Sequence, residues 1–459
     1  MDLPASLFVQ IPSYRDPQLI PTLIDLVRRA AAPAALHVVV CWQHGDEATL
    51  QDFLAAGFQL ESSCIGDQHP IHRLRLNGAE VELIEVGFMH ARGCGWARRL
   101  AQERYRDERY NLQIDSHHRF SDAWDGLLVE MLESLRTRSC KPLLTGYPPA
   151  FQPESYPDTR QNHVGQMLVR GFNSVGVVSY KAVRMPQDPV RHEPMRARFI
   201  SGGFLFSDGE FVREVMNDAD HFFSTEEVVM AVRAYTHGYD FFHPHRPLLW
   251  HQYNSDANRV WDDQSDERRS RGEIDASAFD RSLRASGKAA SMLAAAGSGD
   301  ATALAMHGLG CKRSLQQYER YAGLSFAHRG VHEEATRATE PDNAHFATDE
   351  QHWLDKLICR RVFQVQVKRL GTEIGSADDL ESLVLTAQAE DGTTVGRREL
   401  SPEDLQQLIT RGEYVCIDHF SSCPSRLPAC YQMQVGGDSQ DDANRFQVIV
   451  REIEEDLIA

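Results

Sequence analysis

Residues 110–120, YNLQIDSHHRF, decide the expected fold and carry the most informative motif of this 459-residue chain. The first five residues of the stretch have the length and pattern of a buried β-strand. Asp115 ends that strand, and His117 follows two residues later. Because residues i and i+2 of an extended segment point to the same side, the carboxylate and the imidazole can converge on one ligand.

Similar strand and helix patterns lie on both sides of this stretch. Short apolar runs predict strands at 7–11, 36–42, 81–86, 110–114, 143–147 and 199–206. Apolar residues at helical spacing predict helices at 17–31, 90–106, 123–136 and 225–237. This alternation predicts the α/β class and a largely parallel sheet, with ligands at the carboxyl ends of its strands.

The rest of the chain predicts a second, smaller domain. Prolines interrupt residues 148–198, which is typical of a long ordered loop that covers an active site. The expected division is an α/β domain at residues 1–330, a linker at 331–350 and a β-rich accessory domain at 351–459.

The charge of the chain excludes general nucleic-acid binding. Acidic residues outnumber basic ones by 66 to 48, so the net charge is −18 and no basic face offers itself to phosphates or anionic lipids. No segment approaches the roughly 18 apolar residues of a membrane span, and no signal peptide is evident. Nine cysteines without a Cys-x-x-Cys motif predict buried free thiols and a cytoplasmic location.

The motif at the end of the 110–114 strand predicts a divalent metal site. Asp115 and His117 supply an oxygen and a nitrogen ligand, which suits Mn²⁺ or Mg²⁺. His251 ends a later apolar run, where a third ligand is expected, whereas His243 and His245 flank a proline and fit a loop. The alternative interpretation is an aspartate that caps a turn beside an exposed histidine.

Three further groups are candidates for binding or catalysis. Glu226 and Glu227 open a helix, where they either complement the helix dipole or bind a sugar or acceptor hydroxyl. Arg98 can clasp phosphate oxygens or belong to a solvated helix face. The loop after the first strand can bind a nucleotide base or form an ordinary turn, and it consists of Ser13, Tyr14, Arg15 and Asp16.

An ordered set of motifs resembles the GlcNAc-type glycosyltransferases, relatives of cytoplasmic eukaryotic enzymes that modify a hydroxyproline of a ubiquitin-ligase subunit. The chain is also similar, more remotely, to the polypeptide GalNAc-transferases. The resemblance spans roughly residues 5–326, and residues 340–459 resemble no known family. The motifs are IPSYRDP, VCWQ, ARGCGWAR, LQIDSHHRF, FISGGFLF, TEE, THGYDFFHP, WHQY and GLGCKRSLQQYERYAGLSF.

The resemblance implies a GT-A fold, the nucleotide-diphospho-sugar transferase fold, and a retaining transfer of N-acetylglucosamine. It implies UDP-GlcNAc as donor, Mn²⁺ or Mg²⁺ as cofactor, and an acceptor hydroxyl on a protein or a small molecule. Residues that match the motifs of the family divide into three sets: Asp115, His117 and His251 for the ion; Ser13–Asp16 and Arg98 for the nucleotide; Gly202 and Gly203 for the sugar pocket.

Two alternative functions remain open at this stage. One is a glycan- or partner-binding protein built on a degenerate transferase, with the β-rich region as the recognition module. The other is a transferase that acts on a small molecule. No partner other than the donor and a hydroxyl-bearing acceptor is expected from the sequence.

Overall fold

The structure is a computed structural model that describes residues 6–453, apart from 67, 174–175, 186–191, 254–257, 295–307, 342–347, 371–379 and 437–444. The chain divides into two compact units. The first contains Met1–Arg170, Val177–Ala322 and Arg337–Asp342. The second contains Gly171–Gly176, Gly323–Thr336 and Asn343–Ala459. The boundary at residue 330 that the sequence suggested stays a prediction.

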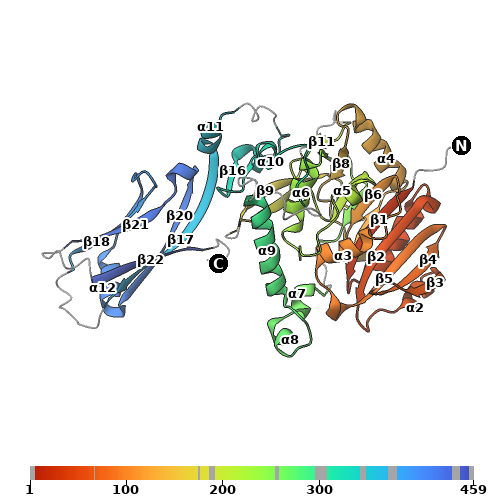
Figure 1. Ribbon diagram of the computed structural model, residues 1–459, viewed down its shortest axis with the longest axis horizontal. Coiled ribbons are helices and arrows are strands. Elements are labelled where there is room, and N and C mark those ends of the chain that lie inside the picture. Colours follow the sequence, from red (N-terminus) through yellow and green to blue (C-terminus); the bar gives the residue numbers. More distant parts are fainter. Residues whose placement is uncertain are drawn as a thin grey trace. The chain divides into compact units, whose positions relative to one another are not determined.

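A ten-stranded sheet forms the centre of the first unit (Figure 1). In spatial order its strands are β11 (Met195–Arg196), β13 (Asp240–His243), β8 (Pro142–Thr145), β12 (Phe204–Asp208), β6 (Tyr110–Ile114), β1 (Leu7–Tyr14), β2 (Leu36–His44), β5 (Ala79–Gly87), β4 (Pro70–Leu76) and β3 (Gln59–Ile65). The predicted strands at 7–11, 36–42, 81–86, 110–114 and 143–147 are all present.

The sheet is mixed, so the prediction of a largely parallel sheet is wrong in part. Strands β6, β1, β2 and β5 are parallel neighbours, and β13 is parallel to β8. Strand β12 is antiparallel to both β6 and β8, and the described residues of the connection from β8 to β12 contain no α-helix. Strands β4 and β5 form a hairpin whose turn, Asn77-Gly78, has the two positive φ angles of a type I′ turn.

Helices cover both faces of the sheet. Helices α1 (Leu19–Arg29) and α4 (Trp124–Ser134) pack on one face, where Leu23, Leu26 and Leu128 belong to the same core cluster as Leu7, Val9 and Ile11 of β1. Helix α3 (Cys94–Gln102) packs on the other face against Phe8 and Val39. The central strands are therefore buried on both sides, which explains their continuous apolar sequences.

Several further elements complete the first unit. Helix α6 (Glu226–Thr236) begins at the predicted acidic pair, and strand β14 (Leu249–His251) pairs with β7 (His118–Phe120). The others are α2 (Leu50–Ala55), α5 (Phe211–Glu214), α7 (Val260–Asp263), α8 (Asp266–Ser270), α9 (Ala278–Ala294), α10 (Leu315–Ala322), and the pair β9 (Gly165–Phe172) and β10 (Val178–Arg184) within the proline-rich segment. The predicted strand at 199–206 begins only at Phe204, since Ser201 and Phe204 form a bridge across a tight reversal.

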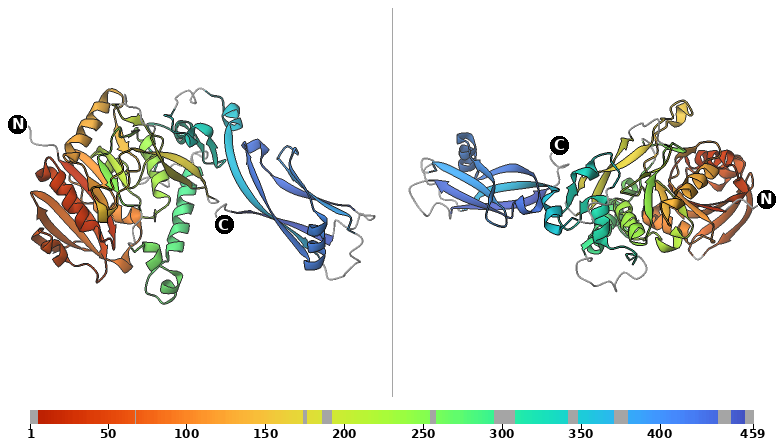
Figure 2. Two further views of the ribbon diagram at one scale, coloured as in Figure 1. Left: turned by 180° about the vertical axis from the view of Figure 1, so that it is seen from behind. Right: turned by 90° about the horizontal axis from the view of Figure 1, so that it is seen from above.

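The second unit is β-rich, as predicted, and contains two sheets (Figure 2). One consists of β15 (Leu324–Ser325), β16 (Gly330–His332), β17 (Leu357–Arg369), β20 (Glu413–Ser422) and β22 (Phe446–Ile453). The other consists of β19 (Thr394–Glu399), β18 (Ser382–Gln388) and β21 (Cys430–Gly436). Helices α11 (Glu350–Asp355) and α12 (Pro402–Arg411) complete this unit.

Two sequence expectations about surface and solvent can be compared with the structure. None of the described helices is long and apolar enough to cross a membrane. All nine cysteines are free, but only Cys41, Cys359 and Cys416 are buried, so the expectation of uniformly buried thiols is wrong.

Candidate active site

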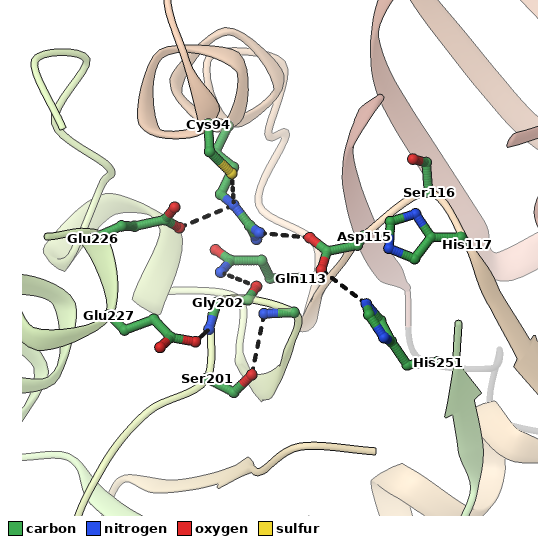
Figure 3. A network of polar contacts seen from close by, with 12 residues as sticks. Cys94, Gln113, Asp115, Ser116, His117, Ser201, Gly202, Glu226, Glu227 and His251 are labelled. Atoms are coloured by element: carbon green, nitrogen blue, oxygen red, sulfur yellow. Dashed lines mark hydrogen bonds and ion pairs between the residues drawn. The ribbon is translucent and has the colours of Figure 1, made fainter. Parts of the chain in front are cut away.

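Asp115 lies at the carboxyl end of β6, in the middle of the ten-stranded sheet. Its Oδ1 accepts a hydrogen bond of 2.9 Å from Arg98 Nη2, and its Oδ2 lies 3.3 Å from His251 Nε2 (Figure 3). Burial would raise the pKa of Asp115, but the hydrogen bond from His251 and the charge of Arg98 hold that pKa well below its ordinary value. The carboxylate is therefore ionised and able to act as a ligand.

His117 is oriented by Asp16, a residue of the loop after β1. His117 Nδ1 lies 2.7 Å from Asp16 Oδ2, and the Ser116 hydroxyl donates to the same oxygen at 2.5 Å. Burial alone would lower the pKa of His117, but the hydrogen bond and charge of Asp16 raise it. With Nδ1 bound to a carboxylate, Nε2 is the nitrogen left for a ligand, which is the usual arrangement of metal-binding histidines.

His251 reaches Asp115 because β14 pairs with β7. In this short antiparallel pair His251 is opposite His118, the residue after His117. Burial holds the pKa of His251 below its ordinary value, so the imidazole is neutral at neutral pH. Ligand atoms of Asp115, His117 and His251 all lie within 4.8 Å of one another. The structure thus brings together the three residues that the sequence proposed as metal ligands.

This cluster fits a divalent cation. It combines one ionised carboxylate with two imidazoles, a donor set that first-row metals such as Mn²⁺ accept. Adjacent ligands of an octahedral ion with bonds of about 2.1 Å lie about 3 Å apart, and Asp115 Oδ2 and His251 Nε2 are 3.3 Å apart. The ring of His251 contacts Asp115 Oδ2 through Nε2, and its buried Nδ1 has no hydrogen-bond partner among the described residues.

A second group of potential ligands, His37, Glu80 and Glu82, does not fit a metal. Glu82 is fully buried and already forms ion pairs with Arg104 and Arg106. A cation there would have to displace two arginines. We interpret this group as a structural ion-pair network.

Arg98 lies between two carboxylates from different elements. Its guanidinium, 2% exposed, forms one ion pair with Asp115 and another, at 2.9 Å, with Glu226 at the start of α6. Its Nε also donates to Cys94 Sγ, one turn earlier in α3. Burial raises the pKa of Glu226, although the charge of Arg98 opposes this effect. Arg98 therefore connects α3 with the end of β6 and the start of α6.

Glu227 holds the turn that carries the two glycines predicted for the sugar pocket. Its Oε1 accepts a hydrogen bond of 2.8 Å from the Gly202 backbone N–H, and its Oε2 accepts one of 2.9 Å from the Tyr147 hydroxyl. Burial raises the pKa of Glu227 to about 7. A Cβ added at Gly203 would lie 2.7 Å from Asp115 Oδ2, so only glycine lets the backbone approach that carboxylate so closely.

The loop predicted to bind the nucleotide is fixed by α7. Asp263 Oδ2 accepts hydrogen bonds from the Tyr14 hydroxyl at 2.9 Å and from Arg15 Nη1 at 2.8 Å. Arg15 also has a positive φ of 45° and lies 4.5 Å from the centre of the Phe88 ring. Ser13 is buried, with its hydroxyl unpaired among the described residues, and Asp16 is engaged with His117.

Sequence reasoning missed several residues that shape this site. Gln113 donates to the Gly202 carbonyl, and the Ser201 hydroxyl accepts from the Gly203 N–H (Figure 3). Tyr147 and Asp263 position Glu227 and the Tyr14 loop, as described above. Gln113 is the one residue with a visible signal, because a polar side chain in a strand buried on both faces requires a partner.

Three solved structures are similar to this chain. GalNAc-T7, crystallised with UDP, GalNAc and Mn²⁺, is 15% identical over 55% of this chain and 44% of its own, with a TM-score of 0.40. S. aureus TarS 1–349 in complex with UDP-GlcNAc is 12% identical over 56% and 60%, with a TM-score of 0.34. The mannosyltransferase PcManGT from Pyrobaculum calidifontis, with GDP-Man and Mn²⁺, is 12% identical over 65% and 77%, with a TM-score of 0.36.

The matched region thus spans less than two thirds of the GalNAc-T7 chain and of the TarS 1–349 chain. No curated protein sequence matches the chain significantly. A protein-family model described as Glycosyltransferase (GlcNAc) matches residues 6–328, which is more than half of the chain. The α/β class, with a β-rich C-terminal region, agrees with the GT-A architecture expected from the sequence motifs. The chain therefore belongs to the GlcNAc glycosyltransferase family.

Proposed function

We propose that this protein is a divalent-metal-dependent glycosyltransferase that moves N-acetylglucosamine from UDP-GlcNAc to an acceptor hydroxyl, with retention at the anomeric carbon. The observation that supports it most is the convergence of Asp115, His117 and His251 at the carboxyl end of β6. Membership of the GlcNAc glycosyltransferase family supports the reaction class. Mn²⁺ or Mg²⁺ would be held by these three residues.

In this proposal the residues around the cluster prepare the site for a nucleotide sugar. A bound divalent ion supplies positive charge that stabilises a departing diphosphate. Asp16 fixes the ring of His117, and Arg98 fixes the carboxylate of Asp115. The loop of Ser13–Asp16, fixed by Asp263, meets the nucleotide. These interactions exist before the donor arrives, so little reorganisation is needed.

The turn at Gly202 and Gly203 forms one wall of the proposed sugar pocket. The two glycines let a sugar approach the backbone of this turn closely, because no Cβ stands in the way. Glu227 holds this turn through Gly202, and Glu226 holds Arg98. We propose that the two glutamates act by positioning these groups. The acceptor hydroxyl attacks the anomeric carbon as UDP leaves, and its proton passes to a phosphate oxygen of UDP.

We also propose a division of labour along the chain. Residues 1–330 would form the domain that carries out the transfer reaction. Residues 331–350 would link it to an accessory domain formed by residues 351–459. All the residues of the candidate active site lie in the first unit. The accessory domain therefore has no part in donor chemistry in this proposal.

The decisive experiment measures UDP release with the full chain. UDP-GlcNAc, UDP-GalNAc and UDP-glucose are each supplied with Mn²⁺, with Mg²⁺ or with EDTA, and products are identified by mass spectrometry. UDP-GlcNAc with Mn²⁺ should be the best combination, and EDTA should abolish release. Asp115→Ala should lose at least 100-fold in rate, whereas Glu130→Ala, an exposed carboxylate on α4, should not. Equal turnover of Asp115→Ala and the wild type would refute the proposed metal site.

A further inference from the structure

The core of the second unit follows a regular inward pattern. Its two sheets face each other through alternate residues, which include Val365 and Val367 of β17, Leu383 and Leu385 of β18, and Cys416 of β20. In antiparallel sheets, residues paired in register share a face, and every second residue along a strand returns to that face. The register therefore predicts which positions further along these strands also face inward.

At one end of this core, two inward positions hold charged residues. Asp418 follows Cys416 by two residues, and Arg398 pairs in register with Leu385. Arg398 Nη2 donates to Asp418 Oδ1 at 2.6 Å, and the Tyr431 hydroxyl donates to Asp418 Oδ2 at 3.2 Å. The carboxylate is 15% exposed. The guanidinium of Arg398 is 41% exposed, so this ion pair presents its charged groups where the core meets solvent.

Beyond the charged pair, the space between the sheets stays open. Gly396 and Ala387 are partners in register, and their small size makes room for the ring of Phe420 on one wall of that space. The ring of Phe420 lies over Gly396, where an added Cβ would be 3.2 Å from two ring carbons. The result is a cleft of about 980 Å³, which is in the upper part of the range for small-molecule sites.

The cleft combines an aromatic wall with groups that both donate and accept hydrogen bonds. Phe420 and Tyr431 supply apolar ring surface. The guanidinium of Arg398 donates hydrogen bonds, and the carboxylate of Asp418 beside it accepts them. Threonine and serine hydroxyls add to the rim, and the charged lining consists of Arg397, Arg398, Arg426, Glu399 and Asp418. This lining is close to neutral, although the whole chain carries a net charge of −18.

We propose that this cleft binds a saccharide. Of two neighbouring sugar hydroxyls, one can donate a hydrogen bond to a carboxylate while the other accepts one from an adjacent guanidinium. The C–H face of a sugar ring is apolar and fits against an aromatic side chain, as Phe420 offers. An anion such as phosphate would meet the carboxylate of Asp418, and an apolar peptide would cover the Arg398–Asp418 ion pair without forming hydrogen bonds to it. The proposal is independent of the donor chemistry at Asp115.

The test titrates the full chain, in EDTA, with four probes: the methyl β-glycosides of N-acetylglucosamine, glucose and galactose, and di-N-acetylchitobiose. Isothermal titration calorimetry should detect saturable binding of at least one. Asp418→Ala and Phe420→Leu should each weaken that binding at least 10-fold. Glu390→Ala, an exposed carboxylate of the same unit, and Asp115→Ala should leave it unchanged.

Three controls keep the result interpretable. Thermal unfolding verifies that the variants fold. If Asp418→Ala does not fold, Phe420→Leu still tests the site, because it preserves most of the apolar volume. UDP release from UDP-GlcNAc by Asp418→Ala and Phe420→Leu should stay at the wild-type rate, so failure of this proposal is separable from failure of the proposed transferase activity. Absence of saturable binding to all four probes would overturn the saccharide site. Binding that persists in both variants, or binding of inorganic phosphate alone, would overturn it as well.

Discussion

Asp16 Oδ2 and His117 Nδ1 lie 2.7 Å apart, although 101 residues separate them in sequence. This contact joins the loop after β1 to the motif after β6, two strands that are parallel neighbours. It fixes which nitrogen of His117 faces Asp115 and His251. The loop that the sequence assigned to the nucleotide thus also controls the geometry of the proposed metal site.

Asp16→Ala should weaken Mn²⁺ binding. Loss of the carboxylate frees the His117 ring to rotate and to carry its proton on either nitrogen, and loss of such an outer partner typically costs 10–100-fold in metal affinity. Electron paramagnetic resonance of free Mn²⁺ during titration measures this affinity without substrate.

Ser116→Ala is the matched control for that experiment. It removes the other hydrogen bond to the same Asp16 oxygen and leaves the bond to His117 in place. Its Mn²⁺ affinity should remain within about threefold of the wild type. If Asp16→Ala and Ser116→Ala had equal affinities, Asp16 would have no orienting role.

Gly203→Ala should impair the site far more than Gly202→Ala. At Gly203 a Cβ would lie 2.7 Å from Asp115 Oδ2, whereas at Gly202 the nearest atoms would be 3.6 Å away. The first substitution must displace the proposed ligand, and the second makes an ordinary contact. Mn²⁺ affinity and UDP release should both fall at least 10-fold in Gly203→Ala only. Similar losses in the two variants would indicate a general effect on the turn instead.

The sequence predicted the parts of the fold that local patterns encode. Strand β6 was predicted with the bounds that the structure has, because Tyr110, Leu112 and Ile114 alternate along it and a charged residue follows. Strand β3 was missed, since all its residues are exposed at the edge of the sheet and show no alternation. Apolar patterns report burial, so an unburied strand gives no signal.

The candidate site was predictable as residue types but not as contacts. Asp115 and His251 could be named because each ends an apolar run, and His117 because it follows Asp115 by two residues. The ion pairs of Arg98 could not, because they depend on how α3 and α6 meet above the sheet. Arg98 was expected to clasp phosphate, and in the structure its guanidinium lies between two carboxylates. Long-range contacts of this kind follow from topology, which a single sequence specifies only indirectly.

Arg98→Met should destabilise the first unit. The substitution keeps an unbranched apolar stem but leaves Glu226, whose side chain is 6% exposed, without its cation. Removing one partner of a buried ion pair costs on the order of 3 kcal/mol. Urea unfolding followed by tryptophan fluorescence measures this change, because five of the six tryptophans belong to the first unit.

Two companion variants test the cause of that loss. Arg99→Met removes the neighbouring ion pair with Glu103, whose side chain is 50% exposed, and should cost less than about 1 kcal/mol. Arg98→Met combined with Glu226→Gln should recover part of the lost stability, because no uncompensated charge then remains at position 226. A double variant no more stable than Arg98→Met alone would show that packing, not charge, explains the effect.

The raised pKa of Glu227 predicts how stability depends on pH. Burial raises this pKa to about 7, although the Gly202 N–H and the Tyr147 hydroxyl oppose the shift. An unfolded glutamate has a pKa of about 4.3, so between pH 5 and 7 the folded protein binds a proton that the unfolded chain has released. Stability from this group therefore falls as pH rises through that window.

Glu227→Gln removes this titration. As pH rises, the free energy of unfolding of the variant should increase relative to that of the wild type by at most ~1.4 kcal/mol per pH unit. Tyr147→Phe removes a bond that stabilises the charged form and should extend the window to higher pH. Urea unfolding at half-unit steps from pH 5 to 8 distinguishes these curves, and parallel curves for all three proteins would mean that Glu227 is ionised throughout.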